Sequence, residues 1–350
     1  IEHFRHFNKE PAWSAKPLHL VKNGGTATSI KDFFSGTASK ELYKRKLDWY
    51  AKRYSSNPTI YIWELWNEVN TVQGGGNSLQ EATVQYEWTK EMLPELRKRF
   101  PDRLTAQSLG SFNHPKDRET FRAFSSIPEN DLAQVHRYLD VGADLKICHG
   151  PVDVMMADAV TELRNFNLNK PILLSEGGAV EARHSGLFRY YATDKAGMLL
   201  HDILFAPFFA GAAAGGQFWH WRDYIYKNGL WYHFRRFYEV VKDLDPPAEN
   251  FTPTIQVQEN LRLYTLKGYH TTLIWCRDTN NTWITELQQN NAPQTIRNFS
   301  LHLQEHFSDK RYKVKVYDPW KNKWKKGKVK DGKLALPDFS RSIVVKIRYK

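Results

Sequence analysis

The sequence has few of the residues that build a disulfide framework or a thiolate metal site. Its 350 residues include only two cysteines, Cys148 and Cys276. They lie far apart in the chain, and we expect both to be small buried hydrophobic residues. No apolar run approaches the length of a membrane-spanning helix. There is also no cysteine and histidine ligand spacing and no phosphate-binding loop, so we expect neither a metal nor an organic cofactor.

Negative charge is scarce only at the C-terminal end. The formal net charge is +12, but residues 309–350 hold 15 Lys or Arg against 4 Asp or Glu, which leaves about +1 for residues 1–308. A basic end could bind an anionic polymer. Its lysines alternate with apolar residues, as in 313–316 (KVKV), which is typical of the solvent face of a strand. No known nucleic-acid-binding motif is present, and we expect no nucleic-acid partner.

Short apolar runs alternate with longer amphipathic stretches over the first 245 residues. The predicted strands are 61–65, 104–108, 132–136, 172–175 and 215–219. The predicted helices are 39–54, 79–99, 154–166, 192–209 and 232–244. Strands that alternate with helices predict βαβ units and a parallel sheet, so the fold class is α/β.

The pattern changes after the segment 245–247 (DPP). Short alternating runs follow at 261–266, 272–276, 312–317 and 343–347, with turn signals between them. This pattern predicts an antiparallel, immunoglobulin-like β-sandwich of about a hundred residues. We therefore expect a catalytic domain over 1–247 and a sandwich domain over 248–350.

Two glutamates carry the strongest chemical signal. The segment 61–70 (YIWELWNEVN) is an apolar strand that ends at Glu68, and 171–178 (PILLSEGG) is a buried strand that ends at Glu176. The carboxyl ends of parallel strands are where barrel active sites lie. Glycoside cleavage needs one neutral carboxyl group and one carboxylate, and a separation of roughly 5–5.5 Å gives retention. Either glutamate alone could equally be a solvated loop residue.

These motifs resemble glycoside hydrolase clan A, whose members are retaining (β/α)8 TIM barrels with the catalytic glutamates on strands four and seven. The resemblance implies that Glu68 is the acid/base and Glu176 the nucleophile. It also implies that Asn67 binds the hydroxyl group next to the reacting carbon. We expect the neighbouring Trp66 to contact the substrate and to raise the pKa of Glu68 by desolvation.

Two further segments fit the same resemblance. His136 and Tyr138 end the presumed sixth strand on one face, and clan members place there a tyrosine whose hydroxyl contacts the nucleophile. Trp219 and Trp221 end the presumed eighth strand, where the clan has an aromatic platform for the reacting sugar. The alternatives are a structural histidine and ordinary packing of aromatic rings at the barrel mouth.

If Glu68 lies on strand four, residues 1–7 (IEHFRHF) correspond to strand three. Strands one and two then have no sequence, and a barrel cannot close without them. We therefore expect this chain to be a fragment, in which either a separate or cleaved N-terminal polypeptide completes the barrel or the first two strands precede Ile1 in the same polypeptide. On strand three, His3 and Arg5 are candidates for contacts with the sugar.

The sequence thus predicts a glycosidase, an enzyme that cleaves a β-linked polysaccharide without a cofactor. We expect the aromatic residues Trp13, Tyr224 and Trp231 to be exposed and to line a long cleft, so we expect an endo-β-glucanase, with β-1,3-glucan as the preferred substrate. The alternatives are a hydrolase of an acidic polysaccharide and a non-catalytic glycan-binding protein. An enzyme with such a substrate is expected to be secreted, periplasmic or at the cell surface.

Overall fold

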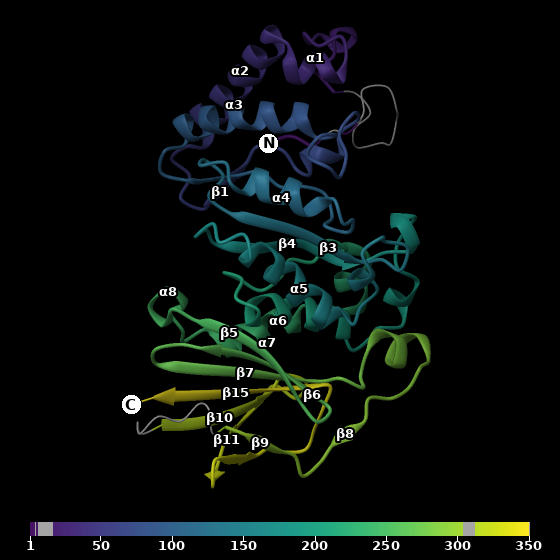
Figure 1. Ribbon diagram of the computed structural model, residues 1–350, viewed down its shortest axis with the longest axis vertical. Helices are drawn as coiled ribbons and strands as arrows, with labels where there is room; N and C mark the ends of the chain where they lie inside the picture. The colour runs from purple at the N-terminus through teal and green to yellow at the C-terminus, as the bar shows by residue number, and fades with distance from the viewer. Residues whose placement is uncertain (4, 6–16, 304–311, 350) are drawn as a thin grey trace. The chain divides into compact units, whose positions relative to one another are not determined.

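The computed structural model describes residues 1–3, 5, 17–303 and 312–349. Contacts divide the chain into two compact units. The first consists of Ile1–His136 and Glu162–Ile172, and the second of Arg137–Thr161 and Leu173–Lys350. Figure 1 labels the helices and strands of both units.

The first unit contains parallel strands in sequence order. Glu2 forms a parallel bridge with Trp66. Strand β1 (Ile62–Glu64) pairs in parallel with β2 (Leu104–Ala106). Ser111, which follows β2, forms a parallel bridge with His136 of strand β3 (Ala133–Leu139). Glu2 therefore lies beside the segment that follows β1, while residues 4, 6 and 7 of the expected strand lie outside the described residues.

Helices alternate with these strands. They are η1 (Val21–Asn23), α1 (Ile30–Ser35), α2 (Thr37–Tyr54), η2 (Val69–Thr71), α3 (Thr83–Arg99) and α4 (Asp117–Ser125). Helices α1 to α3 pack together through buried aromatic rings, among them Phe33, Tyr43 and Trp88. The hydroxyl group of Tyr43 donates a hydrogen bond of 2.9 Å to the carbonyl of Leu65. This contact ties α2 to the segment that leads to Glu68.

The second unit begins with the carboxyl end of β3 and contains β4 (Ile172–Ala179). The N–H of Val180 donates to the carbonyl of Leu139, and Gly177 forms a parallel bridge with Phe218. The predicted strand 215–219 therefore lies beside β4, but it forms only a single bridge and no regular strand. The helical segments of this region are η3 (Lys146–His149), α5 (Val152–Arg164), η4 (Ala182–His184), η5 (Arg189–Ala192), α6 (Met198–Phe209), η6 (Trp221–Tyr226) and α7 (Tyr232–Val241).

After the short helix α8 (Pro246–Glu249) strands are the main regular elements of the described residues. A six-stranded antiparallel sheet has the order β11-β10-β15-β7-β6-β5, and β12-β13-β9 and β14-β8 form two smaller sheets (Figure 1). The large sheet comprises β5 (Thr252–Gln258), β6 (Leu261–Lys267), β7 (Thr271–Asp278), β10 (Tyr312–Asp318), β11 (Lys323–Lys326) and β15 (Ser342–Tyr349). The small sheets comprise β8 (Thr295–Ile296), β9 (Ser300–His302), β12 (Val329–Lys330), β13 (Lys333–Ala335) and β14 (Phe339–Ser340), and η7 (Ile284–Gln288) lies in a connection. One hydrophobic core joins residues of all three sheets.

The lysines of β10 behave as the sequence predicts. Lys313 and Lys315 are exposed, whereas Val314 and Val316 are buried. Among the residues that the structure describes, no helix is both long and apolar enough to cross a membrane.

Candidate active site

Glu68 lies just beyond the carboxyl end of β1, in a backbone conformation that is rare for its residue type. Its φ and ψ are 55° and 52°, the left-handed region, which costs a non-glycine residue of order 1–3 kcal/mol. The N–H of Glu68 donates to the hydroxyl of Ser108 at 3.0 Å, and its carbonyl accepts from the hydroxyl of Thr71 at 2.7 Å. A strained backbone that is held in place by several hydrogen bonds is typical of functional positions.

The carboxyl group of Glu68 is buried and has two charged or polar partners. Nδ1 of His136 lies 2.7 Å from Oε1, and the guanidinium group of Arg5 donates to Oε2. Burial by itself raises the pKa of this carboxyl group. The hydrogen bonds and charges of His136 and Arg5 outweigh burial and lower the pKa to about 2. The expectation that desolvation by Trp66 would raise the pKa of Glu68 is therefore wrong.

Trp66 is also wrong as a substrate contact. Its side chain is completely buried and packs against Phe33, Phe34 and Trp88, with ring centroids 5.5–5.7 Å apart. A residue enclosed by helices α1 and α3 cannot stack on a sugar. Trp66 instead stabilises the hydrophobic core between helices α1 and α3 and the segment that follows β1.

The other candidates of the first unit lie near Glu68. The N–H of Asn67 donates to the carbonyl of Glu2 at 2.9 Å, and its half-buried side chain accepts from Ser108 at 3.5 Å. His3 is exposed, and its backbone N–H donates to the side chain of Glu2. Arg5 contacts the carboxyl group of Glu68 itself, so its main observed role is electrostatic. Sugar contacts by these residues stay predictions.

Glu176 lies in β4, in the second unit, and is half-buried. The hydroxyl group of Tyr138 donates to its Oε1 at 2.7 Å, which is the contact expected from the resemblance. A Cβ atom at Gly178 would lie only 3.0–3.2 Å from atoms of Tyr138, His220 and Tyr191. Glycine at this position therefore allows these rings to approach β4 closely.

Aromatic residues follow on the neighbouring segment. The N–H of Trp219 donates to the carbonyl of Gly177 at 2.9 Å, which fixes its backbone beside β4. The side chains of Trp219 and Trp221 are 55% and 56% exposed, as a sugar-stacking platform requires. Tyr224, which we expected to be exposed, is buried, and Trp231 is half-exposed. Trp13 lies outside the described residues.

Three polar residues close to Tyr138 are not apparent from sequence. The carboxylate of Asp140 lies 3.0 Å from Nδ1 of His184, whose ring lies against Tyr138 with centroids 5.0 Å apart. His220 lies 2.9 Å from the hydroxyl of Tyr191, and burial lowers the pKa of its imidazole to about 4. Only their position just after predicted strand ends could have suggested them.

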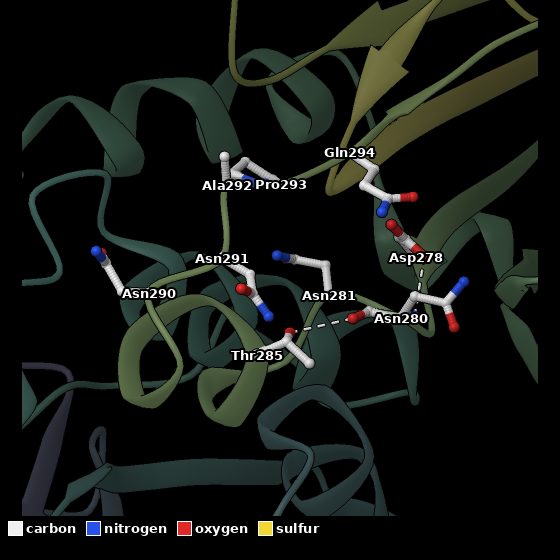
Figure 2. Close-up of a pocket in the computed structure, with 9 residues that line it drawn as sticks. All are labelled: Asp278, Asn280, Asn281, Thr285, Asn290, Asn291, Ala292, Pro293 and Gln294. Atoms are coloured by element: carbon white, nitrogen blue, oxygen red, sulfur yellow. Dashed lines mark hydrogen bonds between the residues drawn. The ribbon is translucent and has the colours of Figure 1, made fainter.

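A polar pocket lies in the C-terminal part of the chain (Figure 2). It has a volume of about 550 Å³. The residues that line it are Asp278, Asn280, Asn281, Thr285, Asn290, Asn291, Ala292, Pro293 and Gln294. None of these nine residues is aromatic, and only one is ionisable. This pocket therefore offers neither a stacking surface for a sugar nor a pair of catalytic groups.

The two clusters supply complementary chemistry. In the first unit, Glu68 forms a hydrogen-bonded pair with His136, which can hold a proton to give or receive. In the second, Tyr138 orients the carboxylate of Glu176, which can attack an electrophilic carbon. The convergence of Glu68 and Glu176 on one substrate, and the absence of a required metal or cofactor, stay predictions.

Comparisons with known proteins agree with this chemistry. A family model described as cellulase (glycosyl hydrolase family 5) matches residues 18–205, a range that includes both glutamates. Putative mannan endo-1,4-beta-mannosidase 9 of Oryza sativa subsp. japonica is 28% identical over 218 residues, 56% of this chain and 51% of that protein. Mannan endo-1,4-beta-mannosidase 1 of Arabidopsis thaliana is 24% identical over 216 residues, 54% of this chain and 51% of that protein. The chain thus spans about half the length of the curated relatives it matches.

Among solved structures, a GH30 endoxylanase from Clostridium papyrosolvens C71 is similar to nearly the whole chain. It covers 94% of this chain and 74% of its own, with a TM-score of 0.53 and 14% identity. At this identity the likeness concerns the fold alone, which is the α/β fold of barrel glycosidases.

Proposed function

Because the chain belongs to glycosyl hydrolase family 5, a family of clan A, we propose that it is the main part of a retaining endo-glycosidase. In this enzyme Glu68 and Glu176 act as a pair. The observation that carries the proposal is that each glutamate lies in or just after a strand with a parallel neighbour, and that each already has an appropriate partner. Glu68 is paired with His136, and Glu176 with Tyr138.

In the first step Glu176 attacks the anomeric carbon, and the bond to the leaving sugar breaks as its oxygen takes a proton from Glu68. Because the pKa of Glu68 is lowered, the proton has to be held by the Glu68–His136 pair. The 2.7 Å contact allows the proton to pass from the imidazole nitrogen to the carboxylate. The products are a covalent glycosyl-enzyme and a shortened chain with a free hydroxyl group.

In the second step Glu68 is ionised and removes a proton from water. The resulting hydroxide oxygen attacks the anomeric carbon and displaces Glu176, so the configuration at that carbon is retained. Here the lowered pKa of Glu68 is no obstacle, since its ionised form is the one needed. Tyr138 stabilises the carboxylate of Glu176 as it leaves.

We propose β-1,4-linked mannan as the substrate class. Both curated relatives described above are named for cleavage of mannan at internal β-1,4 linkages. The β-1,3-glucan that we expected from sequence finds no support in these relatives. Within the enzyme class, β-1,4-xylan is the second substrate to test, and an acidic polysaccharide the third, because of exposed lysines such as Lys313 and Lys315.

The test compares Glu176→Gln with Glu181→Gln, a nearby glutamate that pairs with Arg189 at the surface. Both variants and the wild type are assayed on soluble mannan, xylan and sulfated glycans, at low and high salt. We expect Glu176→Gln to lose turnover by several orders of magnitude while it still binds the glycan, and Glu181→Gln to retain turnover. Turnover that survives in Glu176→Gln, or a wild type that binds glycan but cleaves none, would refute the proposal.

The stereochemistry of the product provides an independent test. Proton NMR of the first product formed shows whether the β-configuration is kept. An initial α-product would mean inversion, which requires carboxyl groups roughly 6.5–9.5 Å apart and excludes Glu176 as a covalent nucleophile.

Two structural expectations belong to the same proposal. They are a domain boundary near residue 247 and a β-sandwich formed by the C-terminal sheets. Limited proteolysis tests both, since cleavage near Asp245 should release a stable C-terminal fragment of about a hundred residues. Secretion or display at the cell surface fits a polymeric substrate and is tested by fractionation.

A further inference from the structure

The segment 279–294, which connects β7 to β8 and contains η7, belongs to the C-terminal part of the chain (Figure 2). Its Glu286 accepts hydrogen bonds from the guanidinium group of Arg341 at 2.6–3.1 Å, and from the amide group of Asn281 at 2.8 Å. Arg341 lies between β14 and β15. These contacts therefore attach the segment, which we call the connecting segment, to the C-terminal sheets.

Trp283 of the connecting segment is buried against the loop that follows β3. Its indole N–H donates to the carbonyl of His149 at 3.1 Å. Gly150 has a φ of 89°, and a Cβ atom there would lie 2.8 Å from Nε1 of Trp283. Glycine at this position therefore allows the indole to approach the loop closely.

The same indole packs against the loop that follows β4. It meets the ring of Phe188 edge-on, with centroids 5.6 Å apart and planes at 71°, and Phe188 packs against Tyr191 with centroids 5.8 Å apart. The hydroxyl of Tyr191 accepts from the N–H of Ala179 at 2.7 Å and donates to its carbonyl at 2.8 Å. Ala179 is the last residue of β4, the strand that contains Glu176.

These contacts form a continuous series of buried side chains. Trp283, Phe188 and Tyr191 are only 6%, 6% and 4% exposed. Because a protein interior is closely packed, the displacement of one of these rings shifts its neighbours. The carboxyl end of β4 is therefore held from the C-terminal part as well as by its neighbouring strands.

We propose that Trp283 is a positioning residue, which acts through the rings of Phe188 and Tyr191 to hold the end of β4 where Glu176 can attack the anomeric carbon. The C-terminal part then influences the rate of glycosyl transfer as well as stability. The inference rests on the proposed glycosidase function, in which Glu176 is the nucleophile. It goes beyond the catalytic pair because it assigns a role to the connecting segment.

The first experiment measures the attack by Glu176 separately from the other steps. The probe is a β-mannobioside with a good leaving group, in which fluorine replaces the hydroxyl group next to the anomeric carbon. Glu176 forms a bond to that carbon, and the leaving group departs as an anion with the bonding electron pair, so no proton from Glu68 is needed. Fluorine slows hydrolysis of the glycosyl-enzyme, and mass spectrometry of the intact protein detects it.

The labelled fraction counts the folded sites, whereas the rate constant of labelling reports the geometry of the folded site. In Trp283→Ala we expect this rate constant to fall roughly ten- to a hundredfold, because a misplacement of about 1 Å can cost about 10²-fold. Trp283→Phe keeps a ring against Phe188 and should recover most of the rate constant. The matched control is Trp324→Ala, which removes a half-buried tryptophan that packs against Tyr317 in the large sheet, and it should be labelled like the wild type.

Tyr191→Phe tests the path of the contacts. It removes the hydroxyl that binds Ala179 and should also slow labelling. If the contacts act in series, the double variant Trp283→Ala/Tyr191→Phe should be slower than the slower single variant by less than about twofold, whereas independent effects would multiply.

Hydrogen exchange of the free protein provides a measurement that needs no glycoside. The amide of Ala179 should exchange faster in Trp283→Ala than in the wild type, and Trp324→Ala should leave it unchanged. If Trp283→Ala fails to fold, Trp283→Leu takes its place in both experiments.

The inference is overturned if the folded variant is labelled with the wild-type rate constant, if Trp283→Phe is as slow as Trp283→Ala, if the effects multiply, or if exchange at Ala179 is unchanged. A wild type that is not labelled would instead contradict the proposed function. Exchange at Ala179 would still decide whether Trp283 holds the end of β4, so the two failures are distinguishable.

Discussion

Replacement of Arg5 by methionine tests the electrostatic environment of Glu68. Arg5 is one of two side chains that lower the pKa of this buried carboxyl group from 4.5 to about 2. A hydrogen bond to a charged group contributes roughly 1.5–3 kcal/mol, which corresponds to roughly 1–2 pH units at 1.36 kcal/mol per unit. In Arg5→Met we therefore expect the pKa of Glu68 to rise by about that amount, with His136 as the remaining partner.

The same change alters stability in a pH-dependent way. A carboxyl group with a lowered pKa stabilises the folded state fully above its ordinary pKa of 4.5, and this stabilisation is lost as the pH falls through about 2. Arg5→Met should therefore lower the free energy of unfolding by roughly 1.5–3 kcal/mol at pH 7 and by progressively less towards pH 2.5. Urea unfolding at several pH values measures this difference.

The control is Arg235→Met, which removes an ion pair with Glu239 at the surface, where the arginine side chain is 73% exposed. Its effect should be within roughly 0.5 kcal/mol at every pH. Destabilisation by Arg5→Met that is the same at pH 7 and pH 2.5 would show that Arg5 contributes packing alone, and the electrostatic reasoning would be wrong.

Three further changes have definite expected outcomes. Tyr138→Phe removes the hydrogen bond to Glu176 and should lower kcat by roughly ten- to a hundredfold with little change in KM; an unchanged kcat contradicts the role of Tyr138. Asp202→Ala removes the carboxylate that accepts two hydrogen bonds from the fully buried Arg277, so chemical denaturation should show a free energy of unfolding lower by roughly 3–5 kcal/mol. The double variant Asp202→Leu/Arg277→Met has no unpaired buried charge and should recover most of this loss. Trp66→Ala should cost roughly 3–5 kcal/mol of stability but leave glycan affinity unchanged, and weaker affinity in folded protein would restore Trp66 as a substrate contact.

The ends of strands were predictable because apolar residues mark the strands themselves and polar residues mark the positions that follow them. Apolar runs at 61–65 and 172–175 mark the strands β1 and β4, although Tyr61 and Ile62 are exposed, and the first polar residues after these runs mark the proposed substrate edge. The alternation of His136 and Tyr138 was equally readable, since side chains two residues apart in a strand share a face. The structure has His136 against Glu68 and Tyr138 against Glu176.

Trp66 was not predictable in the same way, because β1 ends before it. Trp63 stacks on Phe100, and Trp66 packs on Phe33, so both tryptophans face helices although three positions separate them. Strict alternation would place them on opposite faces. The strand ends at Glu64 and the chain then turns through the left-handed conformation of Glu68, so a pattern based on period two fails there.

The pKa of Glu68 was even harder to predict from sequence. The direction of its shift depends on Arg5 and His136, which are 63 and 68 positions away in the chain. The hydrogen bonds and charges of His136 and Arg5 hold the pKa of Glu68 far below neutral pH, so its carboxyl group is almost always ionised at pH 7. Without a partner that supplies a proton, Glu68 would therefore be a poor acid for the first step. With His136 only 2.7 Å away, the proton can reside on the imidazole and move to Glu68 as charge develops on the leaving oxygen. The pH dependence of kcat/KM should then follow the Glu68–His136 pair as a unit. Replacement of His136 by glutamine should abolish the alkaline limb that the pair produces, and a wild-type limb in that variant would mean that the proton has another source.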